Sequence, residues 1–256
     1  MAIIALKAWH LAEYVPIREL EERPHDLRLS RNSLLKSGLR ADFLDEADAV
    51  RQSDWFERYL SGEPVEFYIE GSGGYRVANV DLISHVIYFS KQELMASLEP
   101  TIFFSYQTDY AESGDLLRDE LTRVVDKLNE RSRLSLTLEE SNRLSDGPAR
   151  LTSSLMRKIN QCLLFVADGT PIHQIDGSPP RLIPSPEVCV ELGYALHSKR
   201  PEQVLLLHME RDRDLGPYPF DLPNRYRLSF QNQKELRKAL PEAIESQLRR
   251  FQLFNG

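Results

Sequence analysis

Two glutamates, Glu187 and Glu191, lie one helical turn apart in the stretch Ser185–Leu196. Ser185 suits a helix N-cap and Pro186 suits the first helical position, so this stretch predicts a helix with both carboxylates on one face. Glu191 has apolar neighbours on either side, and desolvation together with repulsion from Glu187 would raise its pKa. Such a carboxylate can act as an acid or base, or stabilise positive charge in a transition state.

Each glutamate also has a simpler interpretation. Glu191 could point to water, as most helical glutamates do. Glu187 could be the catalytic acid instead, but its position near the helix N-terminus is adequately explained by the helix dipole. We therefore expect Glu191 to be the functional carboxylate and treat Glu187 as its rival.

Further polar side chains follow short apolar runs that read as strands. They are Ser105, Tyr106 and Asp109 after the first run, Ser141 and Asn142 after the second, and Asp168 after the third. Ligands of open α/β sheets gather at the carboxyl ends of the strands, so we expect these residues to line one crevice with Glu191. Alternatively, Asp168 and Gly169 could simply form the turn that ends the strand.

Five strands and four helices are expected to position these residues. Continuous apolar runs at 101–104, 162–167 and 204–207 predict central strands, and the alternating runs at 134–138 and 226–230 predict edge strands. Helical spacing predicts helices at 116–128, 151–159 and 236–251 besides the one that carries Glu191. The order of elements predicts a flavodoxin-like, five-stranded parallel sheet with helices on both faces. Pro- and Gly-rich segments at 168–184 and 208–224 are expected to be loops.

Residues 1–96 differ from residues 97–256 and predict a separate, small α+β module. Helical patterns at 33–44 and 47–60 precede a hairpin whose strands are expected at 65–69 and 75–89, joined by the Gly71–Gly74 turn. A run of basic residues with interleaved leucines comprises Arg23, Arg28, Arg31, Lys36 and Arg40. A solvated helix face is the first interpretation of this run, and a contact with a partner or a polyphosphate is the second. The module has no catalytic residues of its own in this interpretation, so we expect a regulatory or partner-binding role.

The strand Thr101–Tyr106 with the following Asp109 resembles the first strand and loop of Toll/interleukin-1 receptor (TIR) domains. Asn160–Asp168 and Glu187–Ala195 occur where those domains have their third strand and glutamate-bearing helix. The phrase Glu191–Ala195 is also similar to the catalytic-glutamate segment of nucleoside 2-deoxyribosyltransferases and of TIR-like domains of bacterial defence systems. The resemblance covers about residues 100–256. This sequence lacks the tryptophan that usually precedes the glutamate in TIR domains.

The resemblance implies chemistry at the anomeric carbon of a ribose. The first function that the resemblance implies is that of an NAD+ glycohydrolase in an anti-phage defence system. NAD is then the substrate, and Glu191 stabilises an oxocarbenium-like centre on the ribose. A homo-oligomer or filament, or a partner bound through residues 1–96, would activate it. The alternatives are a nucleoside or nucleotide N-glycosidase or transferase, and a non-catalytic domain that binds a nucleotide-derived signal.

Composition sets outer limits on function. A net charge of −7 over 256 residues argues against direct binding of nucleic acid, and no apolar stretch is long enough to cross a membrane. Cys162 and Cys189 both lie in apolar runs, which favours buried thiols and a cytoplasmic location. The histidines have no metal-ligand spacing, so we expect neither a metal nor a cofactor.

Overall fold

The computed structural model describes residues 5–30, 38–92, 98–143, 152–178, 180–212, 216 and 222–254. The chain divides into two compact units, Met1–Leu98 and Glu99–Gly256. The sequence pattern had placed this division between residues 96 and 97. Each unit is described by itself below.

The second unit contains a parallel sheet of five strands in the order β13-β12-β9-β7-β8. Their bounds are β7 Glu99–Ser105, β8 Thr137–Glu140, β9 Cys162–Asp168, β12 Val204–Met209 and β13 Arg227–Phe230. The three continuous apolar runs form the central strands and the alternating run at 226–230 forms the edge strand β13, as expected. The other edge strand, β8, begins at Thr137, three residues after the start expected at 134. Every residue of β9 and β12 is buried, which is why these strands lack a polar face.

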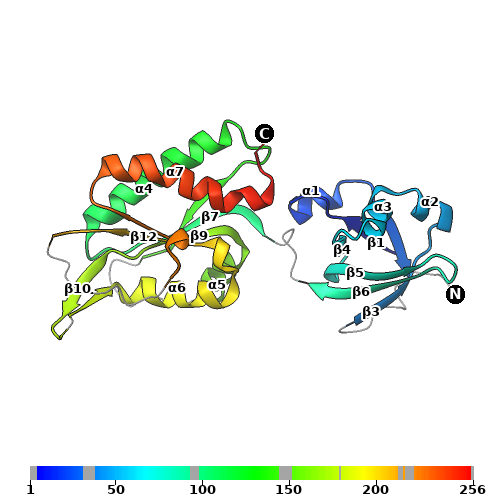
Figure 1. Cartoon of the computed structure of the whole chain (residues 1–256), viewed down its shortest axis with the longest axis horizontal. Coiled ribbons are helices and arrows are strands. Elements are labelled where there is room, and N and C mark those ends of the chain that lie inside the picture. The colour runs from blue at the N-terminus through cyan, green and yellow to red at the C-terminus, as the bar shows by residue number, and fades with distance from the viewer. Residues whose placement is uncertain are drawn as a thin grey trace. The chain divides into compact units, whose positions relative to one another are not determined.

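Helices cover both faces of this sheet (Figure 1). The helices α4 Ala111–Asn129 and α7 Gln233–Leu248 lie on one face, and α5 Ser153–Gln161 and α6 Pro186–Ser198 lie on the other. The Thr152 and Asn232 side chains cap α5 and α7 by accepting from backbone N–H groups. Short 3-10 turns occur at Pro201–Gln203, Asn224–Tyr226 and Arg249–Phe251. The mixed α/β class and the parallel sheet are thus confirmed.

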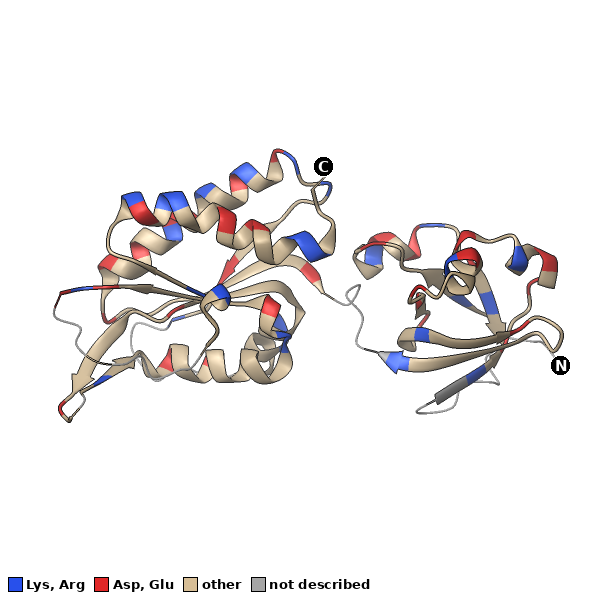
Figure 2. Ribbon diagram, viewed as in Figure 1, with Lys and Arg blue, Asp and Glu red and all other residues tan. Residues whose placement is uncertain are grey.

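The two helical layers differ in charge. Figure 2 shows many charged residues along α4 and α7. Glu187 and Glu191 are the acidic residues of α6, and no Lys or Arg occurs in this helix. A carboxylate on α6 therefore lacks a cationic neighbour within its own helix and must find one elsewhere in the fold.

The segment 168–184 is not simply a loop, as its prolines and glycines had suggested. It contains an antiparallel hairpin of β10 Pro171–Ile175 and β11 Arg181–Pro184. Pro171 pairs with Pro184 at the open end of this two-stranded sheet, and prolines are tolerated at the end of a strand on an edge. The proline content therefore marked strand ends rather than the absence of strands.

The first unit is a six-stranded antiparallel sheet in the order β2-β1-β4-β5-β6-β3. Its strands are β1 Ala5–His10, β2 Leu27–Ser30, β3 Gly38–Asp42, β4 Glu66–Ile69, β5 Gly73–Asp81 and β6 Val86–Gln92. A bridge between Leu29 and Phe43 links the two ends of the sheet, so it is nearly closed into a barrel. Trp55 and Phe67 contact edge to face in its core.

Short helices complete the first unit: α1 Ile17–Glu21, α2 Ala47–Arg51 and α3 Asp54–Leu60. The last two occupy the helical pattern at 47–60, and β4 with β5 forms the expected hairpin. Gly71 and Gly73 adopt positive φ in its turn. The expected strand at 75–89 is two strands, β5 and β6, because the chain turns back at His85, which also has positive φ.

The prediction of a helix at 33–44 is wrong for the residues of this range that the structure describes. Gly38–Asp42 is the strand β3, paired with β6, and residues 33–37 lie outside the described residues. Arg40 and Asp42 are exposed while Ala41 and Phe43 are buried, which is the period of a strand.

The basic run therefore does not form one helical face. Arg28 is in β2 and forms an ion pair with Asp45 at 2.7 Å. Arg40 is in β3, and Arg31 and Lys36 lie outside the described residues.

Candidate functional site

Glu191 is a buried carboxylate at the carboxyl edge of the parallel sheet, with only 1% of its surface exposed. The hydroxyl of Ser105, the last residue of β7, donates to its Oε2 at 2.5 Å. The guanidinium of Arg143 donates to both carboxylate oxygens, from Nη1 to Oε1 and from Nη2 to Oε2, the latter at 3.2 Å. Segments far apart in the sequence thus meet on one carboxylate.

The packing of α6 determines where Glu191 points. Pro186 begins the helix, and the buried residues Val188, Leu192 and Ala195 face the core of the sheet at helical spacing. Glu191 falls between these positions, so its side chain leaves the same face of α6 toward the end of β7. The helix expected from the sequence is confirmed, and it turns Glu191 away from water.

Arg143 is held from two sides. Its Nε and Nη2 donate to the backbone carbonyl of Tyr106 at 2.9 and 2.7 Å, and its guanidinium lies 5.4 Å from the centre of the Tyr106 ring. Arg118 also lies over this ring, at 4.7 Å, and is anchored to Glu140 at 2.8 Å. The paired side chains of Arg143 and Glu191 are 9% and 1% exposed, so the carboxylate is closed to a ligand in this conformation.

Ser141 lies next to this cluster and is 2% exposed. Its backbone N–H donates to Phe104 at 2.9 Å, and the register Phe104↔Glu140 puts Ser141 opposite Ser105 on the neighbouring strand. Residues opposite each other in a parallel pair point to the same face of a sheet. Among the residues that the structure describes, the buried Ser141 hydroxyl has no hydrogen-bond partner, an unusual state for a polar group.

Asp168, at the end of β9, belongs to a different polar cluster. It is fully buried and accepts from the Ser113 hydroxyl at 3.0 Å, from the Gln107 amide at 3.3 Å and from the Thr170 backbone N–H at 3.0 Å. Burial raises the pKa of Asp168, against the opposing effect of these hydrogen bonds. The cluster joins the start of α4 to the ends of β9 and β12, because the Met209 N–H donates to the Thr170 hydroxyl.

The structure thus brings Ser105, Tyr106 and Ser141 together with Glu191, as the sequence suggested. It does not join the other three expected residues to them. Asp168 lies in its own cluster, while Asp109 and Asn142 are exposed. Among the contacts of the described residues, none links Asp109 or Asn142 to Glu191.

Arg143 was missed by sequence reasoning. It is one arginine in the polar segment after β8, and its partner Glu191 is 48 residues away in the chain. The one local signal is that a cation follows a strand whose carboxyl end was expected to face a crevice. Such a signal does not distinguish Arg143 from any other surface arginine.

The rival glutamate, Glu187, is in a different setting. It is partly exposed and accepts a hydrogen bond from the Ser185 hydroxyl at 2.6 Å. This bond, with a smaller contribution from the positive charge of Arg143, lowers the pKa of Glu187. Its position is explained by local contacts at the helix N-terminus.

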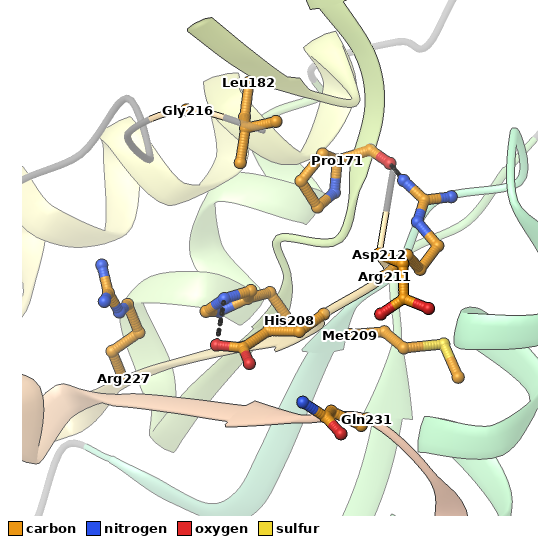
Figure 3. Close-up of a pocket in the computed structure, with 10 residues that line it drawn as sticks. Pro171, Leu182, His208, Met209, Arg211, Asp212, Gly216, Arg227 and Gln231 are labelled. Carbon is orange, nitrogen blue, oxygen red and sulfur yellow. Dashed lines mark hydrogen bonds and ion pairs between the residues drawn. The ribbon is translucent and has the colours of Figure 1, made fainter. Parts of the chain in front are cut away.

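A separate cavity of about 410 Å³ opens at the ends of β12 and β13 (Figure 3). It is lined by Pro171 and Leu182 of the β10–β11 hairpin, by His208 of β12, by Arg211 after β12 and by Arg227 at the start of β13. The His208 ring lies 3.7 Å from Glu210, and Arg211 donates to the Pro171 carbonyl. The lining contains neither Glu191 nor any other residue expected at the site, and its positive charges are opposed by Glu210 and Asp212. We therefore base the site on the contacts of Glu191 rather than on this cavity.

Among the residues that the structure describes, no three His, Cys, Asp or Glu side chains are grouped so as to hold a metal ion. Cys162 is buried, and desolvation raises the pKa of its thiol to about 11. Cys189 is partly exposed and its pKa is also raised, by burial and by the charge of Glu187. Both thiols are therefore poor nucleophiles at neutral pH.

No helix in the described part of the chain combines the length and the apolar character needed to span a membrane.

Comparison with known proteins adds little to this geometry. No protein-family profile matches the chain, and no curated protein matches it. One similar solved structure is the metal-soaked Flv1 flavodiiron core from Synechocystis, with a TM-score of 0.33 and 13% sequence identity. The match covers 61% of this chain and 36% of that one, so the chain spans little more than a third of its length.

Proposed function

We propose that the second unit is a TIR-like NAD+ glycohydrolase that cleaves the bond between nicotinamide and ribose, with Glu191 as its catalytic carboxylate. The observation that carries the proposal is the buried Glu191 side chain, fixed by Ser105 and Arg143 at the carboxyl edge of a parallel sheet. Burying an ion pair such as that of Glu191 and Arg143 costs desolvation that its attraction only partly repays, which favours a functional reason for it.

The topology supports the same site. In chain order the strands run 2-1-3-4-5 across the sheet, which is the order of flavodoxin-like folds. Ligands of such sheets bind where the strand order reverses, outside the carboxyl ends of the first and third strands. Ser105 ends the first strand, β7, and α6 is the first α-helix after the third strand, β9.

The reaction assigned to Glu191 requires one fixed negative charge. As the C1′–N bond breaks, its electron pair neutralises the nicotinamide nitrogen and the ribose becomes oxocarbenium-like. Water then adds to C1′ and releases a proton to the solvent. A preorganised carboxylate beside the ribose stabilises this positive centre more than the ground state, which lowers the barrier.

Activation by assembly is part of the proposal. Because Glu191 and its partner Arg143 are both buried, the site is closed in this conformation and needs a trigger that favours opening. We assign that role to a homo-oligomer or filament, or to a partner recognised by residues 1–96, in bacterial anti-phage defence.

Release of nicotinamide tests the proposal. The full chain is incubated with NAD+ alone and after forced oligomerisation on a multivalent scaffold, and nicotinamide is quantified. We expect release in at least one condition and a loss of about 10²–10³-fold in Glu191→Gln, as for removal of a preorganised electrostatic group. Undiminished release by that variant would overturn the assignment.

Glu187→Gln is the matched control, since it makes the same chemical change one turn earlier in α6. We expect release within about threefold of the unmodified chain, because this carboxylate is bound by Ser185 rather than held at the sheet edge. If no nicotinamide is released under any condition, a panel of nucleotides separates the alternatives. Release of another base would favour a nucleotide N-glycosidase, and binding without turnover would favour a signal-binding domain.

A further inference from the structure

Arg143 and Glu191 neutralise each other in a position where neither is easily exposed alone. Their side chains are 9% and 1% exposed, and two N–H groups of the guanidinium meet the two carboxylate oxygens. Separating a buried pair leaves two uncompensated charges, which is strongly unfavourable. A ligand that reaches Glu191 must therefore satisfy Arg143 as well.

The chemistry of the bound groups narrows what such a ligand is. A positively charged ribosyl-pyridinium can replace the guanidinium beside Glu191. Arg143 then needs an anion, and phosphate oxygens suit the fixed fork of a guanidinium as well as a carboxylate does. A zwitterion with a pyridinium and a phosphate exchanges one ion pair for two, whereas a neutral nucleoside offers neither charge.

Ser141 supplies the second observation. Its hydroxyl is buried without a partner and lies on the same face as Ser105, two residues before Arg143. Native folds rarely leave such a group unsatisfied unless a ligand or water completes it. A hydroxyl beside the ribose and phosphate of a nucleotide would gain the acceptor or donor that it lacks.

We propose that Arg143 and Ser141 form the subsite for the 5′-phosphate of a pyridinium nucleotide, and that Arg143 leaves Glu191 to bind this phosphate as the substrate enters. The inference rests on the proposed function and makes Arg143 the residue that selects nucleotides over nucleosides. The carbonyl of Tyr106 remains a pivot for the guanidinium, because Nε donates to it.

The test compares nicotinamide mononucleotide with nicotinamide riboside, which differ by the 5′-phosphate alone. We expect the chain, in its activated form, to have at least a tenfold higher kcat/KM for the mononucleotide. Arg143→Gln should reduce that value at least tenfold more than the value for the riboside, so that the preference disappears, beyond any loss that both substrates share because Glu191 has lost its partner. Ser141→Ala should reduce the preference by a smaller factor.

Arg118→Gln is the matched control, because Arg118 also lies over the Tyr106 ring but is bound to Glu140 and Asp115. It should leave the ratio between the two substrates unchanged. An equal loss on both substrates in Arg143→Gln, or no preference in the unmodified chain, would overturn the inference.

Calorimetry distinguishes the absence of a phosphate subsite from the absence of glycohydrolase activity. If neither compound releases nicotinamide, the binding of each to the unmodified chain and to Arg143→Gln is measured. Mononucleotide binding that weakens at least tenfold more than riboside binding in the variant supports the phosphate subsite without catalysis. Equal binding of both compounds, or of neither, contradicts it.

Discussion

Glu191 and Asp168 are two buried carboxylates at the same edge of one sheet, and each accepts a hydrogen bond from a serine. They differ in their other partners. Glu191 is paired with the positively charged guanidinium of Arg143, whereas the groups that donate to Asp168 are the neutral ones of Ser113, Gln107 and Thr170. The difference suggests that one cluster is built to exchange a partner and that the other ties α4 to the sheet.

The largest expected effect breaks the Asp168 cluster. Asp168→Asn replaces an acceptor by an amide whose own N–H groups face the donors of Ser113 and Thr170. These donors cannot turn to water, so we expect a loss of about 2–3 kcal/mol in the free energy of unfolding. Chemical denaturation of the full chain, followed by the signal of the second unit, measures it.

Glu191→Gln is the matching change in the other cluster, and it should cost less. The Arg143 guanidinium keeps its hydrogen bonds to the Tyr106 carbonyl when the carboxylate is lost, and the oxygen of the new amide can still accept from it. We expect a loss of about 1 kcal/mol in the free energy of unfolding, below the 3–5 kcal/mol of a fully buried pair. A larger loss than in Asp168→Asn would show that Arg143 is locked, and the comparison would fail.

The pH dependence of stability tests the Asp168 cluster further. Burial raises the pKa of Asp168 above its ordinary value of 3.8, so its contribution to stability is complete below that value and is lost as pH rises through the folded-state pKa. The destabilisation caused by Asp168→Asn should therefore be greatest near pH 4 and shrink toward pH 7. The change amounts to about 1.4 kcal/mol for each tenfold difference in proton affinity between folded and unfolded states.

Denaturation curves of both proteins at several pH values measure this difference directly. A destabilisation that grows with pH would mean that the negative form of Asp168 is the one that the fold stabilises. That result would contradict the expected sign for Asp168.

Much of the scaffold could be predicted from the sequence, because the signals are local. The continuous apolar runs of β7, β9 and β12 and the Pro186 start of α6 depend on neighbours within a few residues. Two elements of the fold could not be predicted in this way. The leucines around β3 repeat at helical spacing, yet pairing with β6 makes it a strand, and the prolines of the β10–β11 hairpin masked its pairing.

The site was predictable where strand ends determine it and not where distant side chains meet. Ser105 and Ser141 are neighbours because their strands pair in register, which the rule for parallel sheets anticipates. Arg143 lies in the segment after β8 and forms an ion pair with Glu191 of α6. Nothing in the local sequence of Arg143 indicates that contact. Asp168 is at the expected strand end, but the enclosure by Ser113 and Gln107 depends on how α4 packs.

The smallest expected effect on stability is at Ser141, and its sign is informative. The hydroxyl is buried without a partner, so Ser141→Ala removes an unsatisfied group and should leave the free energy of unfolding unchanged or raise it by up to about 1 kcal/mol. Ser105→Ala, at the opposite position of the register, should lower it by about 1 kcal/mol, because its hydroxyl donates to Glu191. Denaturation of the two variants under identical conditions measures both changes in the free energy of unfolding.

A polar group that lowers stability while its neighbour raises it is typical of a position kept for a ligand. If Ser141→Ala were as destabilising as Ser105→Ala, the hydroxyl would have a structural partner, and the exchangeable character of the Glu191 cluster would depend on Arg143 alone.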